Sequence, residues 1–279
     1  MFADLHIHSW YSDGTLDPGE IINKAKSQNI ILISICDHNL IDSYGELENL
    51  CRINDIKIIA GVEINSAMDD MDYHILAYGF DMKNKALNGL LQYNRSIHID
   101  MGKKLIEKIS ADYPNISLEE FIKYERNRKN GGWESLDYMR SKKVIDSDSV
   151  LDYLNLLGKY KISFDTDFLS PEDVITIIHN AGGYAVLAHP GDNAGQNLEM
   201  CEKKAVQFLG MGIDGFECYY PSHSKEITEF LVTFCNEHDL MITAGSDEHG
   251  GFNNFEGGCE YYIGAVKVKI EQLNLKGVP

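Results

Sequence analysis

The sequence predicts an α/β protein, a seven-stranded (β/α) barrel with a mostly helical insertion. Short apolar runs alternate with amphipathic helices over the first ninety residues, which is typical of βα units around a parallel sheet. From about residue 83 to residue 168 helical patterns replace the strand pattern, and the alternation then resumes. We therefore expect two barrel parts, at 1–82 and 169–279, separated by an insertion at 83–168.

The first part contains four expected strands and two helix starts. Asp17-Pro18-Gly19-Glu20 predicts a helix start, with Asp17 as N-cap, proline at the first position and a glutamate three residues after the cap. Ser43-x-x-Glu46 predicts the start of the next helix. The expected strands are Phe2–Leu5, Ile30–Cys36, Ile56–Ile64 and Tyr73–Phe80. The second of them is a continuous β-branched run of the kind found in buried parallel strands.

The middle part predicts helices joined by polar loops such as Asn130-Gly131-Gly132. The expected helices are Leu87–Ile109, Leu118–Arg128 and Val150–Leu157. Between Asn94 and Asp165 there are 13 Lys and Arg against 12 Asp and Glu, whereas the rest of the chain has 12 against 31. This different surface favours an insertion.

The last part resumes the barrel pattern. Ser170-Pro171-Glu172-Asp173 predicts a capped helix that ends near Gly182-Gly183. The expected strands are Tyr184–Ala188, Ile213–Tyr219 and Leu240–Ala244.

Composition and charge exclude several classes of protein. The formal charge of −18 argues against a membrane-surface protein and against a stable nucleic-acid complex. No apolar run approaches the roughly 20 residues needed to cross a bilayer, and the N-terminus does not resemble a secretory signal. The six cysteines are scattered without a CxxC pair, so we expect buried free thiols and a cytoplasmic protein.

Histidines and carboxylates follow the expected strands. His6-x-His8 follows the first strand, and residues two apart in an extended segment face the same side. Most of the other members also lie at a strand's carboxyl end, where barrel enzymes place their catalytic groups. The nine candidate metal ligands are His6, His8, Asp13, His38, Glu63, His74, His189, Asp247 and His249.

This joint pattern predicts a metal centre. Imidazole and carboxylate without cysteine suit Zn²⁺, Mn²⁺ or Fe²⁺ better than Mg²⁺ or Ca²⁺. Nine ligands are too many for one divalent ion and suffice for two or three, and Glu63 can bridge because a carboxylate has two oxygens. By contrast, we expect His98, His179 and His238 to be surface residues. His223, near Glu217 at a strand end, is a candidate to face substrate.

With these residues assembled, the chain resembles the PHP (polymerase and histidinol phosphatase) family of metallo-phosphoesterases. The resemblance covers most of the chain outside the insertion. The matching segments are Asp4-Leu5-His6-Ile7-His8, Ser12-Asp13-Gly14, Cys36-Asp37-His38-Asn39, Gly61-Val62-Glu63, His74-Ile75-Leu76-Ala77-Tyr78-Gly79-Phe80, Ala188-His189-Pro190 and Gly245-Ser246-Asp247-Glu248-His249. It implies a distorted seven-stranded (β/α) barrel.

The resemblance also implies three metal positions. The first would be held by His6, His8, Glu63 and Asp247, the second by Glu63, His74 and His189, and the third by Asp13, His38 and His249. Asp37 would then orient a neighbouring ligand, and His223 and Glu217 would lie where nucleotide-type relatives place substrate-facing residues.

The insertion most resembles that of stand-alone phosphatases acting on small nucleotides, where it would cap the substrate. That subgroup has a Gly-Arg-Pro-His-like segment whose basic residues contact phosphate. The aligned stretch here is Gly131-Gly132-Trp133-Glu134, which lacks both basic groups. Arg95, Arg140 and Lys142 are candidate replacements.

The expected activity is hydrolysis of a phosphate monoester of a small nucleotide, such as a 3′,5′-bisphosphonucleoside. Two metal ions would supply hydroxide and a third would bind phosphoryl oxygens, with His223 as a proton donor to the leaving oxygen. The alternatives are a histidinol-phosphate-type phosphatase, a short-oligonucleotide exonuclease, a C–N hydrolase of amidohydrolase type, and a metal-storing or regulatory protein without catalysis.

Overall fold

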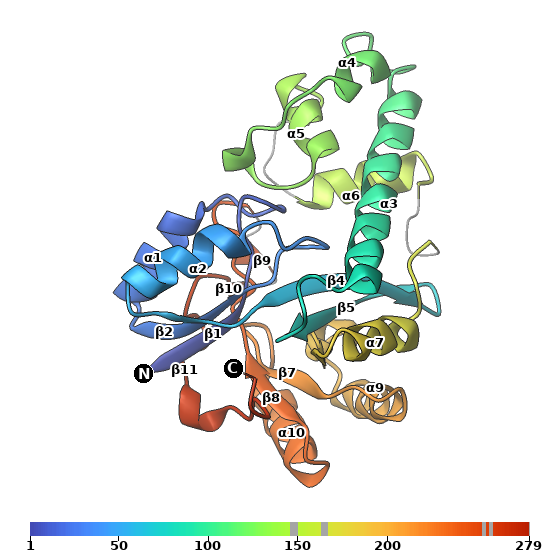
Figure 1. The fold of residues 1–279 in the computed structure, drawn as a ribbon. Helices are drawn as coiled ribbons and strands as arrows, with labels where there is room; N and C mark the ends of the chain where they lie inside the picture. Colours follow the sequence, from blue (N-terminus) through green and yellow to red (C-terminus); the bar gives the residue numbers. More distant parts are fainter. Residues whose placement is uncertain (146–149, 163–166, 253–254, 257–258, 279) are drawn as a thin grey trace.

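The computed structural model describes residues 1–145, 150–162, 167–252, 255–256 and 259–278 (Figure 1). Its strands are β1 (Phe2–Ile7), β2 (Ile30–Ile35), β3 (Lys57–Ile58), β4 (Gly61–Met68), β5 (Met71–Tyr78), β6 (Tyr184–Leu187), β7 (Gly215–Tyr219), β8 (Met241–Ala244), β9 (Phe255–Glu256), β10 (Cys259–Glu260) and β11 (Val268–Lys269). Its α-helices are α1 (Pro18–Ser27), α2 (Tyr44–Ile53), α3 (Lys85–Ile109), α4 (Leu118–Ile122), α5 (Glu134–Ser141), α6 (Val150–Lys159), α7 (Pro171–Asn180), α8 (Pro190–Asn193), α9 (Leu198–Gly210) and α10 (Lys225–Glu237). The 3₁₀ helices are η1 (Arg128–Asn130) and η2 (Ile270–Gln272).

The main strands form two sheets rather than one closed barrel. One sheet has the order β11-β1-β2-β3 and the other has the order β4-β5-β6-β7-β8. Single bridges, Ile7 with Glu248 and His38 with Glu63, join the two sheets. The α/β class is therefore as expected, but the described strands show no continuous barrel ladder.

The sheets also depart from the expected parallel order. We expected one strand at Ile56–Ile64, but the chain leaves β3, which pairs with β2, and begins β4, which pairs with β5. Asp69 and Asp70 both have positive φ, 55° and 58°, as a two-residue type I′ hairpin turn requires. This tight turn makes β5 antiparallel to β4, and β5 is also antiparallel to β6.

Between β5 and α7 the described residues form helices and no strand, and these helices gather on one side of the sheets (Figure 1). They share a separate apolar cluster, which includes Leu105 and Leu136 and which Phe252 joins from the segment after β8. The helix expected at Leu118–Arg128 ends at Ile122. Helix α5 was not expected from the sequence, because it is short and Trp133 alone separates its first residue from two glycines.

Two of the three helix starts expected from the sequence have the expected side-chain caps. The capping box of Asp17 and Glu20 is present at α1, and Ser170 caps α7. Ser43 precedes α2 but makes no side-chain cap bond.

The five cysteines whose side chains are described are free and buried; the side chain of Cys259 lies outside the described part. Among the described residues, none of the helices has the length and apolarity that crossing a membrane requires.

Candidate metal centre

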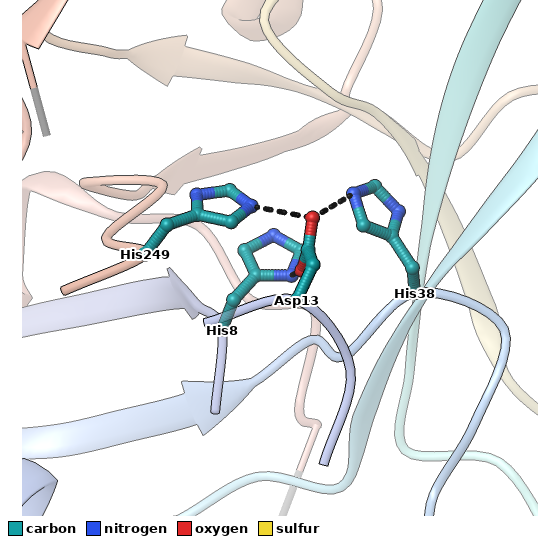
Figure 2. A group of neighbouring side chains, drawn as sticks. All are labelled: His8, Asp13, His38 and His249. Atoms are coloured by element: carbon teal, nitrogen blue, oxygen red, sulfur yellow. Dashed lines mark ion pairs between the residues drawn. The ribbon is translucent and has the colours of Figure 1, made fainter. Parts of the chain in front are cut away.

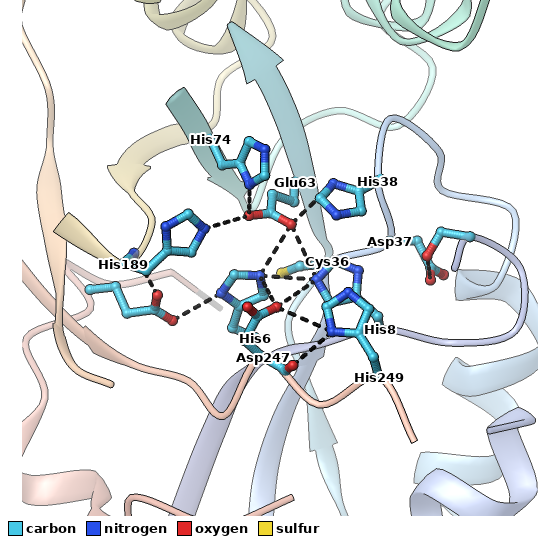
Figure 3. A network of polar contacts seen from close by, with 12 residues as sticks. His6, His8, Cys36, Asp37, His38, Glu63, His74, His189, Asp247 and His249 are labelled. Carbon is cyan, nitrogen blue, oxygen red and sulfur yellow. Dashed lines mark hydrogen bonds and ion pairs between the residues drawn. The ribbon is translucent and has the colours of Figure 1, made fainter. Parts of the chain in front are cut away.

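The nine expected ligands meet at one end of the strands. Strands β1, β4 and β5 carry His6, Glu63 and His74 directly. The remaining six lie in segments that follow β1, β2, β6 and β8. Figure 3 shows eight of these side chains, all but that of Asp13, directed toward one another, with Glu63 in the middle.

The first group surrounds one oxygen of Glu63. His8 Nε2 lies 3.1 Å from Glu63 Oε2 and 3.0 Å from Asp247 Oδ1. His6 Nε2 lies 3.3 Å and 3.4 Å from the same two oxygens. One ligand atom of each of these four residues lies within 4.8 Å of the others, which is close enough for a shared ion.

The other oxygen of Glu63 faces a second set of imidazoles. His74 Nδ1 lies 2.9 Å from Glu63 Oε1, and His189 Nε2 lies 3.3 Å from it. His38, Glu63 and His74 also form a group whose ligand atoms could hold a metal ion. Glu63 thus has the position that a bridging carboxylate needs.

The third group is centred on Asp13 (Figure 2). Asp13 Oδ2 lies 3.3 Å from His249 Nε2 and 3.7 Å from His38 Nε2. His8 joins this group, with its Nδ1 3.5 Å from Asp13 Oδ1. The family resemblance implied His8 in the first group alone, whereas in the structure its two ring nitrogens face two different groups.

Burial and neighbouring charges compete in the cluster. Burial lowers the pKa of His38 to about 3 despite the nearby carboxylates. Burial also opposes the charge of His6, but Glu63, Glu217 and Asp247 outweigh it and raise that pKa well above its ordinary value. The Glu63 pKa lies well below its usual range, because the surrounding imidazoles overcome the burial that would raise it.

The side-chain atoms of the cluster suit divalent metal ions as ligands. His8 Nδ1, His38 Nδ1 and Glu63 Oε2 are buried and make no hydrogen bond within the described residues. Such atoms are costly to bury unless something satisfies them. Imidazole nitrogens and carboxylate oxygens are ligands for Zn²⁺, Mn²⁺ or Fe²⁺.

Glu217 is fully buried behind the cluster and does not face substrate as we expected. Its Oε1 lies 3.0 Å from His6 Nδ1, and its Oε2 accepts the backbone N–H of His189 at 2.8 Å. A carboxylate only accepts, so His6 carries its proton on Nδ1 and leaves Nε2 for a metal. Glu217 thus orients the residues on either side of it.

Asp72 and Tyr220 hold neighbouring ligand side chains in a similar way, the first as an acceptor and the second as a donor. Asp72 Oδ2 lies 3.1 Å from His74 Nε2, so that His74 Nδ1 faces Glu63. Tyr220 donates to Asp247 Oδ2 at 2.8 Å. The sequence analysis did not include Asp72 or Tyr220; Asp72 lies only two residues before His74 and faces the same side of the strand.

Asp37 stabilises the loop that carries Asp13. Its carboxylate accepts hydrogen bonds from Ser9 N–H and Oγ, from Ser12 Oγ and from Ser43 Oγ, at 2.6 to 2.8 Å. Ser12 Oγ in turn lies 3.2 Å from Asp13 Oδ1. The structure places Asp37 behind the ligands, where it fixes their loop.

His223 lies away from the ligand groups. The backbone N–H of Gly191 donates to its Nε2 at 3.0 Å, and its Nδ1 lies 3.1 Å from the carbonyl oxygen of Cys218. An N–H only donates and a carbonyl only accepts, so the ring is held as the neutral Nδ1–H tautomer. Burial also lowers its pKa. Both ring nitrogens of His223 form hydrogen bonds to the backbone. The structure therefore does not show His223 arranged as the proton donor that we expected.

The three candidate basic residues lie in different places. Arg95 lines a small cavity next to Asp13 and His38. Arg140 donates to the carbonyl of Asn130 at 3.1 Å and lies over the Phe252 ring. Lys142 forms an ion pair with Glu120. Of the three, only Arg95 lines a cavity that also reaches the metal centre.

Two further residues of the site, His98 and Arg126, come from the middle part of the chain. His98, expected on the surface, is half-buried, and it lines the cavity of about 240 Å³ over the metal centre. Its Nε2 lies 3.2 Å from Asn65 Oδ1, and Asn65 also contacts His74. Arg126 lines the same small cavity as Arg95. Both belong to the middle part, where no strand periodicity marks a site.

Comparisons with known proteins agree with this geometry. The family model of the PHP domain matches residues 4–164. A 5′-3′ exoribonuclease of Haemophilus influenzae is 29% identical over 255 residues, covering 88% of this chain and 89% of that protein. A 3′,5′-nucleoside bisphosphate phosphatase of Chromobacterium violaceum is 26% identical, covering 88% and 86%.

Among solved structures, a protein from Bifidobacterium adolescentis described as a metal-dependent phosphoesterase has the same fold. It superposes with a TM-score of 0.71 at 24% identity, covering 98% of this chain and 97% of that one. Since the family model spans more than half of the residues, the chain belongs to the PHP domain family.

Proposed function

We propose that the chain is a metal-dependent hydrolase of a phosphate monoester on a small nucleotide. The observation that carries this proposal is the position of Glu63. Its two oxygens face different sets of imidazoles, as expected for a carboxylate shared between neighbouring ions. The proposed occupants are two or three Mn²⁺, Zn²⁺ or Fe²⁺ ions.

The proposed ligand sets follow the three groups. His6, His8, Glu63 and Asp247 would hold one ion, Glu63, His74 and His189 a second, and Asp13, His38 and His249 a third, with His8 and His38 each near two positions. When bound, these ions would lower the pKa of a water molecule and offset the charge of phosphoryl oxygens.

The protein's own groups prepare the site for an anion. Arg95 and Arg126 line the small cavity beside Asp13 and His38, which Glu134 also lines. Arg95 Nη1 lies 3.7 Å from Asp42 Oδ2, so the positive charge that remains comes mainly from Arg126. Arg126 donates to the carbonyl oxygens of Gly132 and Trp10, and within the described contacts no carboxylate neutralises it. Positive charge beside the metal centre favours a phosphorylated substrate, although the chain as a whole is strongly acidic.

The middle helices support the proposed division of the chain. We propose that 83–168 is an insertion that caps the substrate, within a distorted seven-stranded barrel formed by 1–82 and 169–279. Trp133 and Leu154 from this segment line the cavity over the metal centre together with His74 and His189. Buried free thiols favour a cytoplasmic location.

A short-oligonucleotide exonuclease is the second candidate. It is favoured by the similarity to the exoribonuclease of Haemophilus influenzae over most of both chains. Histidinol phosphate is a further candidate substrate. A C–N hydrolase is less well supported, because the central bridging position on β4 is a glutamate, Glu63.

A substrate screen distinguishes these candidates. Phosphate or nucleotide release would be measured with Mn²⁺ on nucleoside bisphosphates, nucleoside monophosphates, 5′-phosphorylated oligonucleotides and histidinol phosphate. The proposal predicts the highest kcat/KM on a nucleotide monoester. Turnover confined to the phosphodiester bonds at the ends of oligonucleotides would replace it with the exonuclease, and turnover of none of these phosphate esters would reject it.

A further inference from the structure

Two cavities adjoin the metal centre in series, away from the strands. The small cavity, of about 50 Å³, shares Asp13, His38, His98 and Trp133 with the metal cavity. The outer cavity, of about 200 Å³, shares His98, Ile99, Trp133 and Glu134 with the small one. A substrate whose phosphate is at the metal ions can therefore extend through the small cavity into the outer one.

The outer cavity differs from the small one in its chemistry. Its wall is mainly aromatic and apolar, and its polar side chains lie among these rings. It is lined by His98, Ile99, Gly102, Lys103, Phe121, Ile122, Tyr124, Trp133, Glu134 and Ser135. Lys103 is paired with Asp100 at 2.9 Å, and the Glu134 carboxylate repels anions. The outer cavity therefore favours an uncharged, planar, aromatic group over a second phosphate.

Trp133 separates the cavities and is held by its surroundings. Its ring stacks on Tyr153 with centroids 5.5 Å apart, and its plane is within 11° of the His98 ring at 6.4 Å. The partly exposed indole lines all three cavities. Its orientation is thus set before any ligand binds, which reduces the entropy cost of stacking.

The residues before Trp133 contact the loop that carries Asp13. Gly132 donates its N–H to the carbonyl oxygen of Asp13 at 2.7 Å. Gly131 and Gly132 both have positive φ, and a Cβ on Gly131 would lie 2.5 Å from Phe252. The sequence at this turn therefore fixes Trp133 relative to Asp13, a proposed metal ligand.

We propose that the outer cavity is a nucleobase subsite in which the base of the substrate packs against Trp133 and His98. The inference rests on the proposed function, because the phosphate of the same nucleotide would be at the metal centre. It adds the part of the site that would select for the base: a phosphate ester that carries an aromatic base is preferred over one that carries a sugar alone. Aromatic stacking suits this role because every base has a π-face, so the subsite accepts several bases.

Calorimetric titration of the Mn²⁺-loaded protein tests the subsite with adenosine 5′-monophosphate and with ribose 5-phosphate. Replacing Trp133 with leucine is expected to weaken binding of the nucleotide about 5- to 100-fold and to leave that of the sugar phosphate unchanged. Trp133→Phe keeps a stacking ring and is expected to retain most of the nucleotide affinity. Equal losses for both ligands, or no loss for either, would overturn the proposal.

Fluorescence gives a second readout that does not depend on turnover. The chain has two tryptophans, so Trp10→Phe leaves Trp133 as the single indole. Adenosine 5′-monophosphate is expected to quench it and ribose 5-phosphate is not. Quenching without hydrolysis of any nucleotide would reject the proposed function while supporting the subsite, and hydrolysis without quenching would reject the subsite alone.

Discussion

At the scale of single residues, Glu63 connects the ligand groups. Its carboxylate is almost fully buried, and ring nitrogens of five histidines lie within 3.3 Å of its two oxygens. Glu63→Gln keeps the shape of the side chain but removes its charge, so we expect bound metal to fall and Mn²⁺-dependent turnover to drop at least about 100-fold. The exposed Glu48→Gln is the matched control. Elemental analysis and phosphate release measure the two effects, and wild-type metal content in Glu63→Gln would contradict them.

Glu217 acts on the metal centre through His6. In Glu217→Gln the amide N–H₂ can donate to His6 Nδ1 and so favour the tautomer with its proton on Nε2, the atom that faces Glu63 and Asp247. We expect metal affinity to fall about 10- to 100-fold, with recovery of turnover at high Mn²⁺ concentration. The control is Glu237→Gln at the exposed end of α10. Turnover that stays low at every metal concentration would show that Glu217 has a different role.

At the scale of elements, Asp4 connects β1 to two loops. It accepts the N–H groups of Ser246 at 2.9 Å and Gly264 at 2.8 Å, and all three groups are buried. Asp4→Ala leaves these donors unsatisfied, so we expect the free energy of unfolding to fall by about 2–5 kcal/mol in urea denaturation. Asp167→Ala, at an exposed position, is the control. A loss below about 0.5 kcal/mol would show that the loops do not depend on Asp4.

The same carboxyl gives a pH-dependent prediction. Burial raises the pKa of Asp4 to about 6 despite the hydrogen bonds it accepts. A raised pKa means that the folded state binds the proton more tightly than the unfolded state, so Asp4 stabilises the fold most below about pH 4 and this contribution is lost as the pH rises through about 6. The free energy of unfolding of the wild type, measured relative to that of Asp4→Asn, is therefore expected to fall as the pH rises from 4 to 7. A difference that does not vary with pH would contradict this.

The sequence predicts most elements because their signals are local. The run at Ile30–Cys36 and the capping box at Asp17 mark β2 and α1 within a residue or two. The antiparallel direction of β5 could not be predicted from the sequence. The turn before β5 consists of two aspartates with positive φ and lacks the Asn-Gly pair that usually marks such a hairpin. The ligands are recognisable because they follow strands. His98 is not, since its place depends on how the long helix α3 packs over the sheets.

At the scale of the whole molecule, the metal centre brings together residues from both ends of the chain. His6, Glu63 and Asp247 come from different strands and loops of the two sheets. An ion that binds only the folded arrangement stabilises it by mass action, about 2.7 kcal/mol at a hundred times the dissociation constant. We expect Mn²⁺ or Zn²⁺ to raise the Tm of the stripped protein by roughly 5–10 °C, as measured by differential scanning fluorimetry. A shift of the same size in Glu63→Gln would show that the ions bind elsewhere.

The most direct test of the central claim joins metal content to turnover in one titration. The protein would be stripped with a chelator and reloaded stepwise with Mn²⁺, while bound metal and phosphate release from adenosine 3′,5′-bisphosphate are measured on the same samples. The account predicts negligible turnover in the stripped protein and turnover that rises as two to three ions bind per chain, with both responses lost in Glu63→Gln. Full turnover in the thoroughly stripped protein would contradict it.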